Sequence, residues 1–276
     1  CRAGKPSSSA AACADGGTPL GRGRPVIAAL SPLYFGEFAS YREVLVTRDD
    51  PRPSIPVRAL LERQMLDSVL RRFDPPNADS DRRALASQWS KWYLVRLVPP
   101  VVAAALVLGR RLPLAFDEVE VVLDAQGIPE AFKLPGEGAA FAAPPQDPFQ
   151  RFAHLLEDHL QPFIQTLAGE ARLSPRVLWS NAGNYFEWFI GEMAKLPPLA
   201  PLLGHGRELL ATERRPDGTR NPLYQPVRYV EVSCAQRPDG LWRQRRTCCI
   251  RYRLDTLGHC DNCPLIDEPP PEPSDL

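Results

Sequence analysis

The sequence predicts an α+β protein: a mainly helical domain with a small antiparallel sheet and a C-terminal hairpin and loop. Three observations lead to this fold class. Apolar residues recur with helical spacing through much of the region between residues 57 and 195. Shorter regions, near residues 118–134 and 227–252, alternate as strands do. With 31 Pro and 18 Gly, the chain should build many short elements with stiff connections.

Composition narrows the class of protein. The chain of 276 residues has 33 basic and 33 acidic side chains, so it lacks the basic excess that nucleic-acid binding by bulk charge requires. We recognise no secretory signal. The longest apolar stretch, Leu97–Leu108, is shorter than the roughly 20 residues of a membrane span. We therefore expect a cytoplasmic protein with at most peripheral, loose association with the inner membrane.

The first elements follow from periodicity. Residues 1–24 are rich in Ser, Ala and Gly, and we expect a flexible N-terminal segment there. A mainly helical body should occupy residues 25–225. Its first helix is predicted over Val57–Phe73, where apolar residues recur at helical spacing. A second begins near Asp81 and should end or kink at Pro99-Pro100, because proline has no backbone N–H to donate.

The middle of the chain combines a hairpin with two more helices. Residues 118–124 and 131–134 read as two short strands joined by a turn. Asp147, followed by Pro148, is a favourable start for a long amphipathic helix. Ser174-Pro175 repeats that start signal, and residues 177–195 should form a helix rich in aromatic side chains.

The C-terminal part changes to a period of two. Residues 226–266 are predicted to form a hairpin and cysteine-bearing module, with a turn at residues 237–240 and a second strand over 241–252. The tail, residues 267–276, contains four Pro and four acidic residues. It is too polar to pack, so we expect disorder.

Four of the seven cysteines fall within sixteen residues: Cys248, Cys249, Cys260 and Cys263. Four thiolates can complete a tetrahedral zinc site or an iron–sulfur cluster, and disulfides are a third alternative. An all-cysteine zinc site usually pairs two Cys-x-x-Cys turns, and only one is present, which favours the cluster. Adjacent cysteines on a strand point to opposite faces, so Cys248 and Cys249 must leave strand geometry. The remaining cysteines are not expected to be ligands: Cys1, Cys13 and Cys234.

Charge is distributed unevenly around these cysteines. Residues 207–253 contain eleven Arg and five acidic residues, whereas residues 254–276 contain six acidic residues and no Lys or Arg. A cluster held by four thiolates is anionic and becomes more so on reduction. Nearby guanidinium groups would stabilise the reduced form. The candidates for tuning the cluster in this way are Arg245, Arg246 and Arg251.

The cysteine region resembles a known family. The run Arg246-Thr-Cys-Cys-Ile-Arg-Tyr-Arg-Leu followed by Cys260-Asp-Asn-Cys-Pro-Leu is similar to the C-terminal signature of the FhuF-type ferric-siderophore reductases. In that family a Cys-Cys-x10-Cys-x2-Cys pattern holds a [2Fe-2S] cluster, and all four positions match. Three upstream runs are also similar to the family's helical body, so the resemblance covers roughly residues 30–266: they begin at Gln88, Leu178 and Asn221.

The resemblance implies a function. An enzyme of this family, an oxidoreductase, would reduce a ferric siderophore of hydroxamate type by one electron and release ferrous iron in the cytoplasm. Electrons would come from a ferredoxin or flavin reductase. The residues agree on the need for an external donor, because no dinucleotide-binding fingerprint is present. The alternative is a helical siderophore-binding or interaction protein whose four cysteines hold structural zinc.

A bulky siderophore complex needs an open, partly aromatic face near the cluster. The candidates from the hairpin and from the helix over 177–195 are Trp242, Trp179, Asn184 and Tyr185. His259 adjoins Cys260, but four cysteines already complete the site, so we do not expect it to bind the metal. No nucleophile elbow is present that would indicate a hydrolase.

Overall fold

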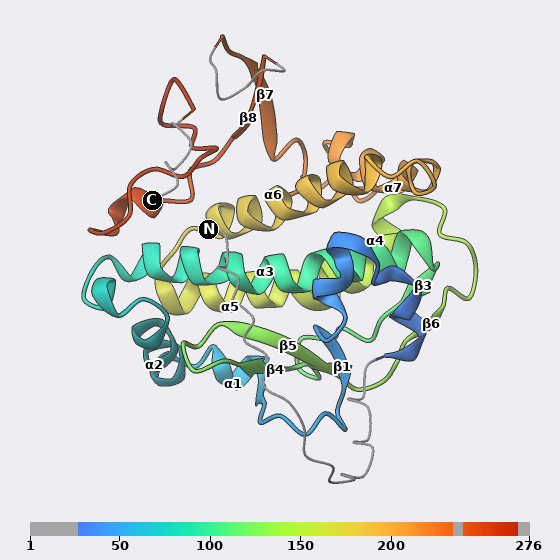
Figure 1. The fold of residues 1–276 in the computed structure, drawn as a ribbon, viewed down its shortest axis with the longest axis horizontal. Coiled ribbons are helices and arrows are strands. Elements are labelled where there is room, and N and C mark those ends of the chain that lie inside the picture. The colour runs from blue at the N-terminus through green and yellow to red at the C-terminus, as the bar shows by residue number, and fades with distance from the viewer. Residues whose placement is uncertain (1–26, 234–239, 270–276) are drawn as a thin grey trace, which may run out of the picture.

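The computed structural model describes residues 27–233 and 240–269 (Figure 1). The predicted N-terminal segment 1–24, part of the hairpin turn, most of the tail, and Cys1, Cys13 and Cys234 therefore lie outside the described residues.

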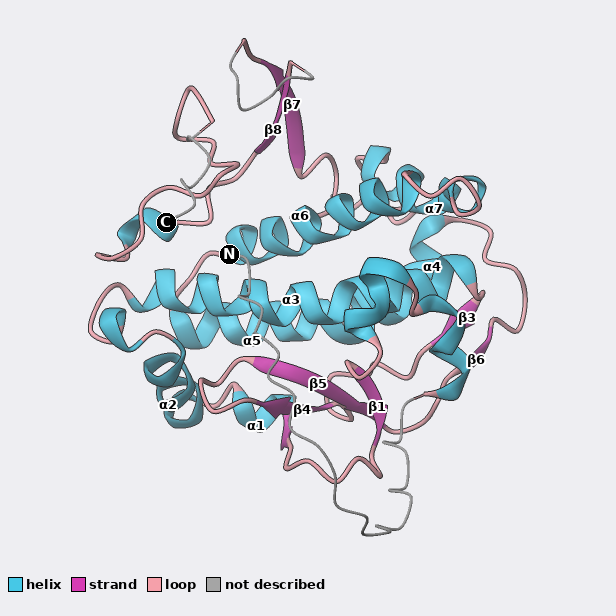
Figure 2. Ribbon diagram, viewed as in Figure 1, coloured by secondary structure: helices cyan, strands magenta, loops and turns pink. Residues whose placement is uncertain are grey.

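The described chain is mainly helical with small sheets, which confirms the predicted α+β class (Figure 2). Its α-helices are α1 (Val57–Leu60), α2 (Arg63–Phe73), α3 (Arg82–Val107), α4 (Pro148–Leu155), α5 (Gln161–Ala171), α6 (Pro175–Ala194) and α7 (Gly204–Ala211). Shorter helical turns are η1 (Ala28–Leu33), η2 (Gly36–Tyr41), η3 (Pro75–Asn77), the π-helical η4 (Leu156–Leu160), η5 (Ala200–Leu203) and η6 (Arg251–Arg253). The strands are β1 (Leu45–Thr47), β2 (Ile55–Pro56), β3 (Arg110–Arg111), β4 (Glu120–Leu123), β5 (Pro129–Leu134), β6 (Ala139–Ala140), β7 (Val227–Glu231) and β8 (Leu241–Arg245).

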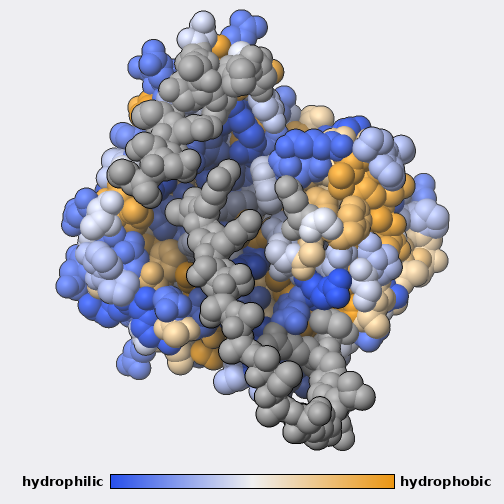
Figure 3. Space-filling view, in the orientation of Figure 1, coloured by the Kyte–Doolittle hydropathy of each residue, from blue (hydrophilic) through white to orange (hydrophobic). Residues whose placement is uncertain are grey.

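The described chain forms three layers, and α3 lies in the middle one. Figure 1 shows α6 along one side of α3 and the four-stranded sheet on the other, with α5 beside α3. The sheet has the order β1-β5-β4-β2. The predicted hairpin is β4–β5, in which Val121 pairs with Phe132. Its two outer strands were not predicted, and β1 runs parallel to β5. The face seen in Figure 3 is mostly hydrophilic, with an apolar area toward the side where Figure 1 draws α7.

Two helices differ in extent from the sequence prediction. The helix expected over Val57–Phe73 is divided into α1 and α2, because Glu62 adopts a non-helical conformation. Leu60 and Leu61 are both fully buried. A change of direction after them lets the apolar residues of both helices reach the core. Of the two outcomes expected at Pro99-Pro100, an end or a kink, the end is absent, because α3 continues through both prolines to Val107.

The carbonyl groups that Pro99 and Pro162 leave without a partner are satisfied by other elements. Pro99 cannot donate to the carbonyl oxygen of Val95, and the Tyr41 hydroxyl donates to that oxygen at 3.1 Å. Asp147 caps the helical run α4–η4–α5, in which Pro162 cannot donate to the carbonyl oxygen of Asp158. That oxygen accepts the backbone N–H of Phe116 instead. Pro162 follows the π-helical turn η4. Tertiary bonds thus keep both proline-containing helical runs going.

Helix α3 is apolar and long enough to cross a membrane by those criteria alone, with a mean hydropathy of 1.3 in its apolar window. However, 72% of that window is buried inside the protein. Its apolar character is thus explained by its place between α6 and the sheet (Figure 1).

The C-terminal hairpin joins β7 to β8, with Val230 opposite Trp242. It projects from α6 in Figure 1. Its base lies close to α6, where a Cβ on Gly183 would come within 2.7 Å of Pro226. The predicted second strand was too long, because β8 ends at Arg245. Beyond it Ile250 has a left-handed backbone conformation, and the chain leaves strand geometry at the cysteines, as predicted.

Candidate metal centre

The four predicted cysteines lie together in the loop that follows β8. This loop packs against the N-terminal ends of α3 and α6. Three of their side chains are at most 7% exposed, and that of Cys248 packs against them half-buried. The Sγ atoms of Cys249 and Cys260 are 3.6 Å apart. This is far beyond the about 2.05 Å of a disulfide and near the about 3.8 Å that separates two thiolates on one tetrahedral metal.

Backbone N–H groups shape this loop around the sulfur atoms. The N–H of Ile250 donates to Cys248 Sγ at 3.2 Å, and that of Leu265 to Cys263 Sγ at 3.5 Å. The N–H of Cys263 donates to the carbonyl oxygen of Cys260 at 3.0 Å, which closes the Cys-x-x-Cys turn. Such N–H···S bonds stabilise thiolate charge.

The N-terminal end of α3 holds Cys249 through three side chains. Ser87 Oγ and Gln88 Nε2 donate to the Cys249 carbonyl oxygen at 2.8 and 3.3 Å. Lys91 Nζ donates to Cys249 Sγ at 3.1 Å and to Gln88 Oε1 at 2.8 Å. Helix α3 therefore fixes both the backbone and the sulfur of this cysteine.

The N-terminal end of α6 holds Arg245, which is only 1% exposed. Its guanidinium donates to Asn181 Oδ1 and, at 3.2 Å, to Ser180 Oγ. Asn181 Nδ2 in turn donates to the Ser87 carbonyl oxygen and to Ser90 Oγ, each at 3.0 Å. One buried polar network thus connects α3, α6 and the guanidinium beside the thiols.

The local charges favour a thiolate at Cys249 and neutral thiols at Cys248 and Cys260. The pKa of Cys249 is lowered to about 3, first by the hydrogen bond from the Cys260 thiol and then by the cations Lys91 and Arg245. The pKa of Cys260 is held above its usual value, because its thiol donates to Cys249 and is buried. Burial also raises the pKa of Cys248. Without a metal, the first negative charge would therefore rest on Cys249.

The donor set fits an anionic metal–thiolate group. Arg245 Nε is buried without a hydrogen-bond partner, and a buried cation is costly unless an anion lies nearby. Across residues 27–233 and 240–269, no three His, Cys, Asp or Glu side chains are already arranged around a single ion. Four thiols packed in one cluster can complete either a zinc site or an iron–sulfur cluster. Cys248, Cys249, Cys260 and Cys263 would hold the metal.

The predicted tuning arginines occupy different environments. Arg245 is buried in the network beside the thiols, whereas the exposed Arg246 donates to Gln225 Oε1 and to the Val227 carbonyl oxygen. Arg251 lies half-buried in η6. Only Arg245 is both buried and close enough to lower the pKa of Cys249.

The residues predicted for an open substrate face are mostly not on one. Trp242 is 1% exposed, and its indole N–H donates to the Asp261 carbonyl oxygen, so it packs under the cysteine loop. Asn184, 9% exposed, accepts hydrogen bonds from Arg243 and Asn262. Burial raises the pKa of Tyr185 to about 12. Of the four, Trp179 alone lines a cavity.

Several residues at the site were missed at the level of sequence. Lys91 contacts Cys249, and Asn181 contacts both Ser87 and Arg245. These polar residues lie on helices in which the neighbouring residues are apolar. Polar side chains at buried helical positions were the available signal. To use this signal, one would have to know which face of α3 contacts the cysteine loop.

Comparison with known proteins places the chain in a family. The family described as "Ferric iron reductase FhuF-like transporter" matches residues 87–236, more than half of the chain. The chain belongs to this FhuF-like family. The resemblance read from the sequence is thereby confirmed, and the protein is an oxidoreductase. The "Ferric siderophore reductase" of Escherichia coli (strain K12) is 28% identical over 185 residues, which is 67% of each chain. The FhuF-like match includes Lys91 and Asn181 and ends before the four cysteines.

Proposed function

We propose that this protein is a ferric-siderophore reductase that uses a [2Fe-2S] cluster held by Cys248, Cys249, Cys260 and Cys263. The observation that carries the proposal is the convergence of these four thiols on the polar ends of α3 and α6. The substrate would be a ferric siderophore of hydroxamate type. The FhuF-like family and the similar E. coli reductase support the reaction class.

The chemistry is the transfer of one electron. A bound cluster supplies electrons one at a time, from a donor such as a ferredoxin or a flavin reductase. Ferric iron accepts the electron and becomes ferrous, which binds hard siderophore oxygens less strongly. Ferrous iron would then be released in the cytoplasm.

The protein's own residues would hold and tune the site. Lys91 and Arg245 place positive charge beside Cys249, which stabilises added negative charge and therefore raises the reduction potential. Ser87 and Gln88 fix the Cys249 backbone, so the sulfur keeps its position when the charge changes. The buried loop limits water around the thiols.

Replacing Cys260 by Ser tests the proposal. Protein purified without oxygen should be red-brown, reduce a ferric trihydroxamate with a chemical donor, and lose both properties in Cys260→Ser. Cys234→Ser is the matched control and should retain both. A colourless wild-type protein containing one zinc ion would instead support the alternative, a siderophore-binding or interaction protein with structural zinc.

Location is tested separately. We propose that the protein is cytoplasmic, with at most peripheral association with the inner membrane. Cell fractionation should then find it in the soluble fraction or release it from membranes with high salt. Retention that only detergent reverses would contradict this.

A further inference from the structure

A cavity of about 370 Å³ opens directly beside the cysteine loop. Its walls come from the start of α6, from residues 220–226 and from the residues just before Cys248. Thr247 lines it and precedes Cys248, so their Cα atoms are about 3.8 Å apart. Ser180 also lines it and accepts from Arg245. Anything bound there would lie next to the cysteine loop.

Three arginines line this cavity: Arg176, Arg220 and Arg246. None of its described lining residues is acidic. In the described part of the chain, Arg176 and Arg220 have no ion pair, and Arg246 donates only to neutral oxygens. Two arginines nearby do form ion pairs: Arg243 pairs with Glu187, and Arg253 pairs with Asp81. Positive charge is therefore left unneutralised in a concave site.

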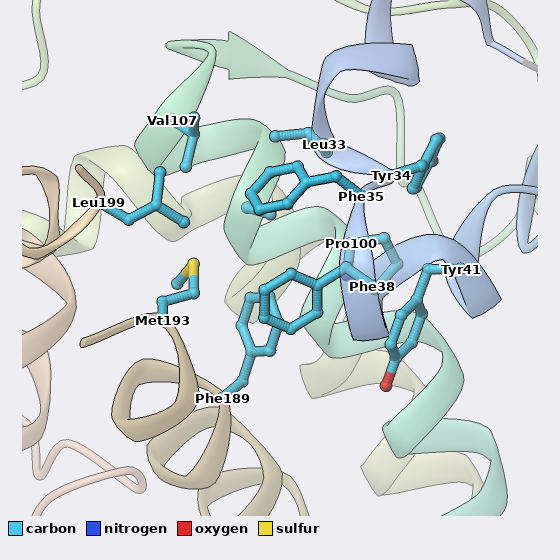
Figure 4. A pocket seen from close by; sticks show the side chains of 11 residues that line it. Leu33, Tyr34, Phe35, Phe38, Tyr41, Pro100, Val107, Phe189, Met193 and Leu199 are labelled. Atoms are coloured by element: carbon cyan, nitrogen blue, oxygen red, sulfur yellow. The ribbon is translucent and has the colours of Figure 1, made fainter. Parts of the chain in front are cut away.

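Size and shape favour a small ligand. The volume lies within the roughly 300–1,000 Å³ of small-molecule sites, and the partly exposed Trp179 adds an aromatic wall. A second pocket, between η1, η2, α3 and α6, is apolar and only about 20 Å³ (Figure 4). That volume is close to a single water molecule.

We propose that the arginine-lined cavity binds the ferric siderophore and selects anionic complexes, whose hydroxamate siderophore also carries free carboxylates. This inference rests on the proposed function and names its substrate class. A ferric trihydroxamate is neutral and offers no charge to three guanidinium groups. Carboxylates do, because the planar guanidinium fork binds them through two parallel hydrogen bonds.

Binding of gallium complexes tests the proposal without any electron transfer, since Ga³⁺ resembles Fe³⁺ and is not reduced under these conditions. The probes are the gallium complexes of a citrate-based dihydroxamate, which is anionic, and of a neutral trihydroxamate. Wild-type protein should bind the anionic complex at least about tenfold more tightly. The double variant Arg176→Gln/Arg220→Gln should lose that preference and bind the neutral complex as wild type does.

The exposed Arg48, which donates to the Glu118 carbonyl oxygen near the sheet, provides the control Arg48→Gln, expected to bind like wild type. A double variant that lacks the wild-type circular dichroism spectrum is replaced by the two single variants, each expected to weaken anionic binding. Equal affinity of wild type for both complexes, or unchanged anionic binding in the variants, would overturn the proposal. So would variants that lose reduction by an acidic ferredoxin while binding gallium normally, because the arginines would then serve the donor. Failure of the wild-type protein to reduce the ferric trihydroxamate would instead refute the proposed function.

Discussion

The two ends of the α3–α6 helix pair differ in what lies between them. At one end the facing side chains are polar and hydrogen-bonded, as in the Asn181 bonds to Ser87 and Ser90. About 18 Å along α3, Pro100 and Phe189 line a tight apolar pocket instead (Figure 4). A buried polar network costs free energy unless it is fully paired. We infer that the polar end is retained for the anionic centre, while the apolar end stabilises the fold.

Removing a large side chain from the apolar end should have the largest effect on stability. Phe189 is 2% exposed and packs edge-to-face on Phe38 with ring centroids 5.3 Å apart. Phe189→Ala should lower the free energy of unfolding by about 3–5 kcal/mol, measured by urea denaturation. The folded variant should keep the reduction potential of wild type. A shifted potential would mean that the two ends are not independent.

Another buried polar group is His159 in η4, which lies between Tyr93 of α3 and Leu114. Its Nδ1 donates to the Leu114 carbonyl oxygen at 2.9 Å, so its Nε2 accepts from the Tyr93 hydroxyl at 2.7 Å. His159→Phe leaves both partners unpaired and should cost about 2–4 kcal/mol.

The pH dependence of unfolding identifies this histidine. Burial lowers the pKa of His159 from 6.5 to about 4. Between these values the unfolded chain binds a proton that the folded chain does not, so wild type loses stability as the pH falls through this range. His159→Phe should lose less over the same range. An unchanged slope would show that His159 is protonated in the folded protein.

At the polar end, charge should matter more than packing. Arg245→Met should lower the reduction potential by tens of millivolts, about 1–2 kcal/mol per electron, because it removes a buried cation beside Cys249. Arg246→Gln is the control, since this side chain is exposed and directed to Gln225. Equal shifts in the two variants, in a redox titration, would show that burial does not decide the tuning.

Lys91→Met should shift the potential in the same direction by a smaller amount. Its ammonium group contacts Cys249 Sγ, but the side chain is partly exposed, so water screens its charge. A shift larger than that of Arg245→Met would reverse the order of the two cations. Redox titration of both variants at one pH decides.

Local signals in the sequence predicted much of the fold, and long-range contacts account for the rest. Asp147 caps its helix as expected, with Oδ1 accepting from the Gln150 N–H at 2.8 Å. The course of α3 through Pro99 depended on Tyr41, 58 residues earlier in the chain, which no local pattern shows. The cysteines could be identified from their spacing. The contribution of Lys91 could not, because it lies 158 residues from Cys249 in the sequence.

Native mass spectrometry of wild-type protein purified without oxygen tests the central claim most directly. If Cys248, Cys249, Cys260 and Cys263 hold a [2Fe-2S] cluster, each chain should carry the added mass of two irons and two sulfides. Cys260→Ser should lack this mass. A wild-type chain carrying the mass of a single zinc ion would contradict the account.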